Sequence, residues 1–163
     1  MEKHNVELTK VKNSLLSVRK QRGEMFMVYF NRVAEEMPKI YRHLTGLGGT
    51  ASVLITDSTE MPFESQIVFD FCPAGKRHGT DIEQLSGGEK SIAALSYMLA
   101  LAAVTKPHMM IMDEVDAFLD TENVQYVTKY FKEHHTKTQT IIISHKEDLA
   151  SSSKSLIGVC MQK

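Results

Sequence analysis

Cysteine is scarce in this sequence. Its only two cysteines, Cys72 and Cys160, lie far apart and outside any C-x-x-C spacing. This scarcity argues against a disulfide framework or a zinc site, and it favours a reducing compartment. We therefore expect both side chains to behave as small buried hydrophobes.

The sequence also lacks an excess of charge and a long apolar segment. Nineteen basic and twenty acidic residues leave a formal charge of −1, so any contact with DNA would need a local patch. The longest nearly apolar run, residues 92–104, contains Ser96 and is shorter than the roughly 20 residues of a membrane-spanning helix. The first residues carry acids and no apolar signal segment follows them. We expect a soluble protein of the cytosol or nucleus without a membrane partner.

A phosphate-binding loop of the form G-x-x-x-x-G-K-[ST] is absent from the 163 residues. The stretch Gly88-Glu89-Lys90-Ser91 is only partly similar, because Glu89 separates the glycine from the lysine and no glycine stands at the required upstream position. We therefore expect that these residues cannot cradle the β- and γ-phosphates of a nucleotide by themselves.

The first third of the sequence has a helical apolar pattern. Between residues 8 and 29, apolar side chains recur at alternating three- and four-residue steps, interrupted at Arg22. This spacing predicts a coiled-coil seam of about three heptads, and an amphipathic helix packed on its own domain fits equally well. The pattern continues to Leu44 and then meets Gly46, Gly48 and Gly49, which favour a helix stop. The seam positions are Leu8, Val11, Leu15, Val18, Met25 and Tyr29.

Two strand-like segments follow the helix. Residues 51–56 and 66–71 are rich in β-branched or aromatic side chains and flank a polar stretch that contains Pro62, which predicts an antiparallel hairpin. Residues 73–79 read as a loop whose three basic or titratable side chains could meet a phosphate backbone. A solvated turn is the alternative interpretation of this loop.

The second half of the chain alternates helices and strands. Residues 109–112 and 140–143 are unbroken apolar runs, as expected for parallel strands buried on both faces. Residues 121–134 are long enough for the crossover helix between them, and residues 156–160 predict a final strand weakened by Gly158. The predicted fold class is α/β, a mainly parallel sheet with flanking helices, forming one domain or half of a larger one.

Residues 86–90, Ser-Gly-Gly-Glu-Lys, stand at the predicted start of a helix. Two adjacent glycines let a backbone approach a ligand closely, and a helix N-terminus presents free N–H groups and partial positive charge to an anion. This pattern predicts phosphate recognition. The alternative is local: Ser86 and Glu89 have the spacing of a capping box, which stabilises a helix start without any ligand.

Titratable side chains follow two of the predicted strands. Asp113 and Glu114 come at the end of one strand, where Asp113 could hold a hydrated Mg²⁺ and Glu114 could polarise a water, with solvated acids as the alternative. His145 follows the next strand and could donate to a terminal phosphate, although a lone histidine is often an ordinary surface residue. Asp120 is placed to cap the helix that begins near Thr121.

These motifs together resemble the SMC (structural maintenance of chromosomes) family, whose heads belong to the ABC ATPase class. The resemblance rests on residues 85–90 and on residues 112–120, Met-Asp-Glu-Val-Asp-Ala-Phe-Leu-Asp, and it extends from residues 18–22 to residues 155–159. Asp-Glu-Val-Asp-Ala is the more specific motif, because transporter-type ABC domains usually continue the acidic pair with Pro-Thr or Ala-Thr.

The resemblance implies two sets of site residues around ATP and Mg²⁺. The residues that would contact ATP held by an opposing head are Ser86, Gly87, Gly88 and Lys90. The residues that would serve ATP on their own head, beside a phosphate-binding loop from an N-terminal lobe, are Asp113 at the metal through water and the catalytic Glu114 and His145. Asp120 would belong to the D-loop that faces the partner head. The chain alone would then be inactive.

The resemblance also implies an organisation and a set of partners. Residues 1–45 would be a coiled-coil stump and the helix that leads into the head, and residues 46–163 the C-terminal lobe of the head. The expected partners are the N-terminal lobe of the same head, a second SMC head in a heterodimer, the C-terminal winged-helix domain of a kleisin, and DNA. The expected location is the chromosome in the nucleus.

Several alternatives remain open within this interpretation. Residues 73–77 and 156–159 look most like the cohesin subunit that binds the kleisin C-terminal domain, and the corresponding condensin subunit matches nearly as well. A double-strand-break-repair ABC ATPase and a non-enzymatic kleisin-docking module are the rival functions. Two residues depart from the family pattern: Phe118 replaces a usually small residue, and many eukaryotic members carry another residue at the position of His145.

Overall fold

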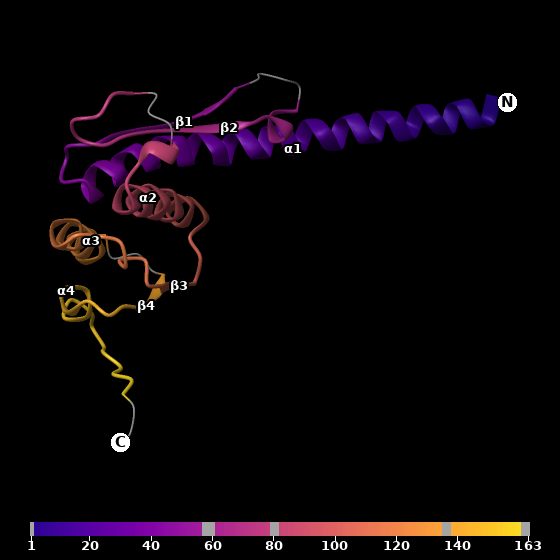
Figure 1. The fold of residues 1–163 in the computed structure, drawn as a ribbon. Coiled ribbons are helices and arrows are strands. Elements are labelled where there is room, and N and C mark those ends of the chain that lie inside the picture. The colour runs from indigo at the N-terminus through magenta and orange to yellow at the C-terminus, as the bar shows by residue number, and fades with distance from the viewer. Residues whose placement is uncertain (1, 57–60, 79–81, 135–137, 161–163) are drawn as a thin grey trace.

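The computed structural model describes residues 2–56, 61–78, 82–134 and 138–160. Its longest element is α1 (Glu2–Leu44), whose first half extends away from the remainder of the molecule (Figure 1). The six seam side chains are between 49% and 66% exposed, so the alternative in which they pack on their own domain is wrong. Pairing of this seam with a second helix stays a prediction.

Arg22, which interrupts the seam, has a partner within the chain. Its guanidinium lies 4.2 Å from the centre of the Phe63 ring, in the short helix η1 (Pro62–Glu64). A cation over an aromatic face is a favourable contact. The break in the heptad pattern is therefore the point at which α1 first meets the folded body.

The second half of α1 is built into the core. Val33, Met37, Ile40, Tyr41 and Leu44 are all buried, at the three- and four-residue steps of one helical face. The helix stops where the sequence predicts, and Gly46 takes the left-handed conformation at φ +60°. An added Cβ at Gly46 would also lie 2.4 Å from the Tyr126 ring, so that ring would have to shift to accept a side chain here.

Strands β1 (Thr50–Ile55) and β2 (Ile67–Cys72) form the predicted antiparallel hairpin, in register from Thr50 opposite Cys72 to Ile55 opposite Ile67. One face lies on α1, where the Tyr41 and Phe71 rings are 5.2 Å apart.

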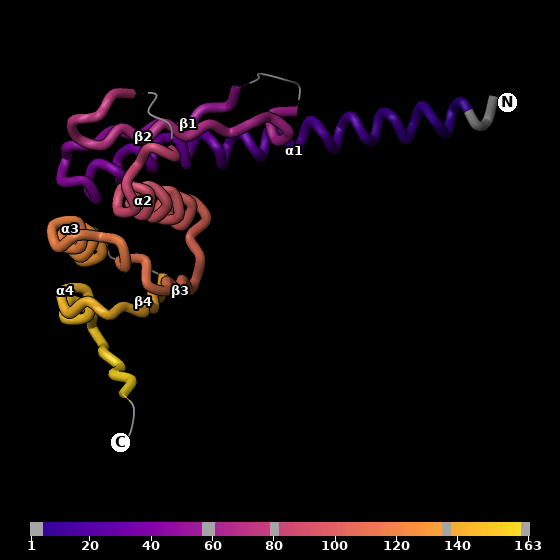
Figure 2. Tube along the Cα trace, viewed as in Figure 1, coloured from indigo at the N-terminus to yellow at the C-terminus, as the bar shows by residue number. Residues whose placement is uncertain are grey.

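Helix η2 (Ile82–Gln84) and helix α2 (Gly87–Thr105) follow. Helix α2 lies between α1 and the second sheet (Figure 2) and buries Ile92, Leu95 and Leu99.

The second sheet consists of β3 (Met109–Asp113) and β4 (Gln139–Ile143), which pair in parallel from Met109 opposite Gln139 to Asp113 opposite Ile143. Helix α3 (Thr121–Glu133) is the crossover between them, and the short α4 (Glu147–Ala150) follows β4. The α/β fold class is confirmed. The described strands form two separate pairs, one antiparallel and one parallel.

Two expectations about the second half of the chain are wrong. Strands β3 and β4 are not covered on both faces, because a row of apolar side chains on one face is exposed: Met109, Ile111, Ile141 and Ile143. Residues 156–160 form no strand, and Ile157 and Val159 are 89% and 96% exposed. The described residues offer this segment no neighbouring strand, and a strand needs one to pair its backbone groups.

The expectation that both cysteines are buried is correct for one of them. Cys72 is buried and Cys160 is exposed, since it lies in the same uncovered terminal segment. Within the described ranges, no helix combines the length and apolar character that a membrane crossing requires.

Gly46 and Gly75 provide a matched test of the helix stop. Both have positive φ, at +60° and +81°, but a Cβ at Gly75 would meet nothing within 4 Å. We expect Gly75→Ala to lower the free energy of unfolding by about 1 kcal/mol through backbone strain alone. Gly46→Ala should cost about 2–3 kcal/mol, because the Tyr126 ring must also move. Equal costs in urea unfolding would show that the Tyr126 contact contributes nothing.

Candidate functional site

The start of α2 is a complete capping box. Ser86 Oγ accepts a hydrogen bond from the Glu89 backbone N–H at 3.3 Å, and Glu89 Oε2 accepts from the Ser86 backbone N–H at 2.7 Å. The capping box, which was the alternative interpretation of this motif, is therefore confirmed. It does not compete with phosphate recognition, because a hydroxyl that accepts from the backbone keeps its own hydrogen to donate.

Lysine side chains support this helix start from two sides. Lys76 Nζ lies 2.6 Å from Glu89 Oε2, and Lys90 Nζ donates to the Glu83 carbonyl at 3.1 Å. Burial of the Glu89 carboxyl would raise its pKa, but the hydrogen bonds from Lys76 and Ser86 and the charge of Lys76 lower the pKa overall. Glu89 is therefore held as a carboxylate at neutral pH.

Two side chains of the basic loop before α2, Lys76 and His78, already pair with acidic residues of the same chain. Besides the Lys76 pair, His78 Nδ1 lies 3.0 Å from Asp70 Oδ2. Gly79, the last residue of the predicted loop, lies outside the described residues. Contact of this loop with a phosphate backbone stays a prediction.

The two glycines of the motif touch the loop that follows β3. A Cβ at Gly88 would lie 2.9 Å from the Phe118 carbonyl oxygen, and a Cβ at Gly87 would lie 3.9 Å from the Phe118 side chain. Gly88 is thus required for close packing inside the lobe. The start of α2 and the loop 114–120 form one continuous surface, on which the Phe118 ring is 74% exposed.

The acid pair lies at the carboxyl end of β3. Asp113 is the last strand residue and shares the exposed face with Ile111. Glu114 takes a left-handed conformation at φ +47°, while its backbone N–H still donates to the Ile143 carbonyl at 2.9 Å. The extended conformation of β3 therefore ends before Glu114. A turn at this residue separates the two acids.

His145 and Glu114 meet at the same edge of the sheet. His145 Nε2 lies 3.1 Å from Glu114 Oε1, and their side chains are 87% and 53% exposed. Parallel pairing produces this contact because the carboxyl ends of both strands open on one side. His145 and Glu114 thus converge at this edge, and both side chains are open to a ligand.

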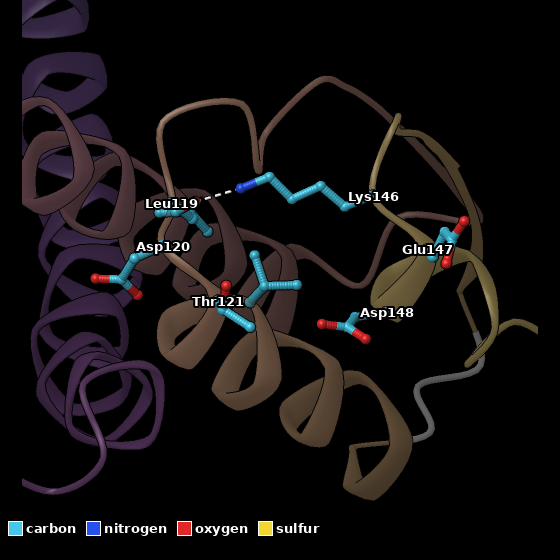
Figure 3. A pocket seen from close by; sticks show the side chains of 7 residues that line it. Leu119, Asp120, Thr121, Lys146, Glu147 and Asp148 are labelled. Atoms are coloured by element: carbon cyan, nitrogen blue, oxygen red, sulfur yellow. Dashed lines mark hydrogen bonds between the residues drawn. The ribbon is translucent and has the colours of Figure 1, made fainter.

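A buried carboxylate that sequence reasoning missed joins the loops after the two strands. Asp116 is 2% exposed, and its Oδ2 accepts from Ser144 Oγ at 2.6 Å. Ser144 Oγ in turn accepts from the Lys146 backbone N–H at 2.9 Å. Lys146 extends to donate its ammonium to the Leu119 carbonyl (Figure 3). The position of Asp116 within Asp-Glu-Val-Asp is the only sequence signal for this role.

Asp120 caps α3, as predicted. Its Oδ1 accepts from the Asn123 backbone N–H at 2.8 Å, and it also lines an open pocket of about 450 Å³ between the start of α3 and α4 (Figure 3). Neither Glu114 nor His145 lines this pocket. The residues that do are Leu119, Asp120, Thr121, Val124, Lys146, Glu147 and Asp148.

The described residues contain no group of three or more His, Cys, Asp or Glu side chains able to hold a metal ion. Mg²⁺ commonly keeps several waters and uses only one or two carboxylates together with substrate phosphates. Asp113, an exposed hard oxygen donor at the edge of the sheet, fits that pattern through water.

Known proteins share this sequence and this fold. The family model described as RecF/RecN/SMC N terminal domain matches residues 2–163. Structural maintenance of chromosomes protein 1 of Saccharomyces cerevisiae is 37% identical over 171 residues, which cover 99% of this chain and 14% of that protein.

Two solved structures match the fold. An Smc head domain with an extended coiled coil, bound to the C-terminal domain of ScpA and derived from Pyrococcus furiosus, has a TM-score of 0.84 and 29% identity, covering 99% of this chain and 40% of that one. A structure from work on ATP-driven dimerization and DNA-stimulated activation of SMC ATPases has a TM-score of 0.75 and 29% identity, covering 86% of this chain and 83% of that one.

The fold and the shared sheet edge define the class as an α/β lobe of an ABC-type ATPase head. The chain belongs to the SMC family of chromosome proteins. It spans 14% of the length of its Saccharomyces cerevisiae relative.

The Asp116 network predicts a stability effect. We expect Asp116→Ala to lower the free energy of unfolding by about 1–3 kcal/mol, because it leaves the Ser144 hydroxyl without its acceptor. Asp148→Ala, at an exposed acid on α4, is the control and should stay within about 0.5 kcal/mol of wild type. Urea unfolding measures both. A similar small effect for the two variants would remove Asp116 from the list of stabilising residues.

Proposed function

We propose that this chain is the C-terminal lobe of an SMC ATPase head, which sandwiches ATP with a partner head and hydrolyses it together with its own N-terminal lobe. The observation that carries the proposal is the Glu114–His145 contact at 3.1 Å, formed where two parallel strands end. The similarity to SMC heads, including one from work on ATP-driven dimerization, supports the same reading.

The sheet edge would serve ATP held by the same head. Bound Mg²⁺ supplies charge neutralisation for the phosphates. Asp113 would hold its water shell, since it is an exposed carboxylate at the strand end. Glu114 would accept a proton from the attacking water. His145 would orient Glu114 and donate toward the terminal phosphate, because its ring already reaches the Glu114 carboxylate and is otherwise exposed.

The start of α2 would serve ATP held by the opposing head. Ser86 offers its hydroxyl hydrogen, and Gly87 leaves the approach to the first N–H groups of the helix free of a side chain. Gly88 brings Phe118 of the loop 114–120 against this start, and we expect the exposed Phe118 and Asp120 to lie on the side that would face the partner. Lys90 would add positive charge from the first turn, in addition to its bond to the Glu83 carbonyl.

The partners follow from this arrangement. Residues 1–45 would continue a coiled coil, and residues 46–163 would join an N-terminal lobe that supplies the missing phosphate-binding loop, so this chain alone would not hydrolyse ATP. The Pyrococcus furiosus relative is bound to the C-terminal domain of ScpA. We propose that this chain likewise binds the C-terminal winged-helix domain of a kleisin, and that DNA and a second SMC head are its other partners. The 37% identity to Structural maintenance of chromosomes protein 1 favours a cohesin subunit acting on chromosomes in the nucleus.

Glu114→Gln tests the catalytic assignment. In a complete head with its partner, we expect this substitution to slow ATP hydrolysis by roughly 10²-fold or more while the ATP-bound heads remain associated. Glu133→Gln, at the far end of α3, is the matched control and should leave turnover unchanged. Steady-state phosphate release and size-exclusion chromatography give the two readouts. Unchanged hydrolysis in Glu114→Gln would remove this residue from the mechanism, and a wild-type complex without turnover would favour a docking module.

Ser86→Arg tests the contact in trans. The larger, charged side chain would enter the head–head interface, so we expect ATP-dependent association to be lost while each head still binds nucleotide. Thr105→Arg places the same side chain at the opposite, exposed end of α2 and should leave association intact. Analytical ultracentrifugation with ATP compares them. Association of Ser86→Arg at the wild-type level would contradict the proposed interface.

A further inference from the structure

In the proposed function the start of α2 receives a phosphate of ATP, but an acidic side chain already lies there. Glu89 is the third residue of α2, and its carboxylate accepts from the Ser86 backbone N–H at 2.7 Å. A carboxylate in the first turn of a helix is stabilised by the helix dipole and occupies part of the positive potential that would attract a phosphate. A second anion brought to Ser86 would be repelled by Glu89 unless a cation balances its charge.

Lys76 is that cation. Its Nζ lies 2.6 Å from Glu89 Oε2, with side chains 34% and 26% exposed, and 3.5 Å from the Gln84 carbonyl. Tyr41 of α1 is close enough for the charge of Glu89 to act on it, because burial and then that charge raise the pKa of Tyr41 to about 12. A phenol has no cationic form, so Tyr41 does not balance the carboxylate.

The backbone fixes the direction of Lys76. Its N–H donates to the Pro73 carbonyl at 3.1 Å, and its own carbonyl accepts from the buried Cys72 Sγ at 3.1 Å. Lys76 therefore projects from an anchored turn directly after β2, 13 residues before its partner in the sequence. The hairpin and the start of α2 are joined by this ion pair.

We propose that Lys76 is a positioning residue for the contact of Ser86 with ATP on the opposing head: it neutralises Glu89 and fixes the capping box, without touching the nucleotide. The inference rests on the proposed function and adds a residue to it. Glu89 keeps the Ser86 backbone in place, and Lys76 makes that arrangement compatible with a phosphate.

The test uses complete heads and ATP-dependent association of the two heads as its readout. We expect Lys76→Met, which keeps the aliphatic stem without the charge, to weaken association about tenfold. The defect should shrink as salt rises, because ions screen the repulsion between Glu89 and the phosphate. Lys76→Arg keeps the charge and should stay near wild type. Lys39→Met removes the lysine of another Lys–Glu pair, Lys39–Glu36 on α1 at 2.8 Å, and is the control.

A double variant separates charge balance from general support of the loop. Glu89→Gln keeps an oxygen for the Ser86 N–H but carries no charge, and glutamine is accepted in a capping box. We expect Lys76→Met to have no further effect in the Glu89→Gln background. Wild-type association by Lys76→Met, or the same tenfold defect in both backgrounds, would overturn the proposal.

The outcomes also distinguish this inference from the proposed function. If wild-type heads associate with ATP and Ser86→Arg does not, the function stands, and the Lys76 variants decide the inference alone. If wild-type heads fail to associate, both are wrong. In heads without nucleotide, an NMR titration of the Glu89 carboxyl should show a higher pKa in Lys76→Met than in wild type, and an unchanged pKa would also overturn the inference.

Discussion

The parallel pairing of β3 with β4 is the constraint on which the site depends. It brings the ends of two segments separated by α3 to one edge. The register sets Asp113 opposite Ile143, so Glu114 follows the ladder directly on one strand and His145 lies two residues beyond it on the other. The buried Asp116–Ser144 hydrogen bond then ties the two loops to each other. The relative positions of Glu114 and His145 at this edge therefore depend on the pairing of the two strands, and neither strand alone would fix them.

Much of the fold could be predicted from periodicity and turn chemistry. The end of α1 at Leu44, the hairpin, the crossover helix and both parallel strands all follow local rules, since each segment carries its own pattern. The terminal segment 156–160 could not be judged in this way. Its composition is that of a strand, but strand formation depends on a neighbouring backbone, which no local pattern reports. The burial of β3 and β4 was misjudged for the same reason.

The candidate site likewise contains residues that local patterns identify and contacts that they do not. Glu114, His145, Ser86 and Asp120 were identified because their residue types stand at the ends of predicted elements, and the structure places them there. The Lys76–Glu89 pair and the Asp116–Ser144 bond were missed because their members are 13 and 28 residues apart. Contacts of this kind arise from tertiary packing. The left-handed backbone at Glu114 was missed as well, since nothing in the residue type favours it. Such a conformation costs about 1–3 kcal/mol and is often retained at functional positions.

The uncovered apolar row on β3 and β4 has a practical consequence for anyone who handles this lobe. Within the described ranges the row lies on a sheet with two unpaired edges, and such surfaces recruit further copies of themselves into aggregates. Purification of the lobe therefore depends on occupying that face during synthesis, for instance by producing a complementary polypeptide in the same cell.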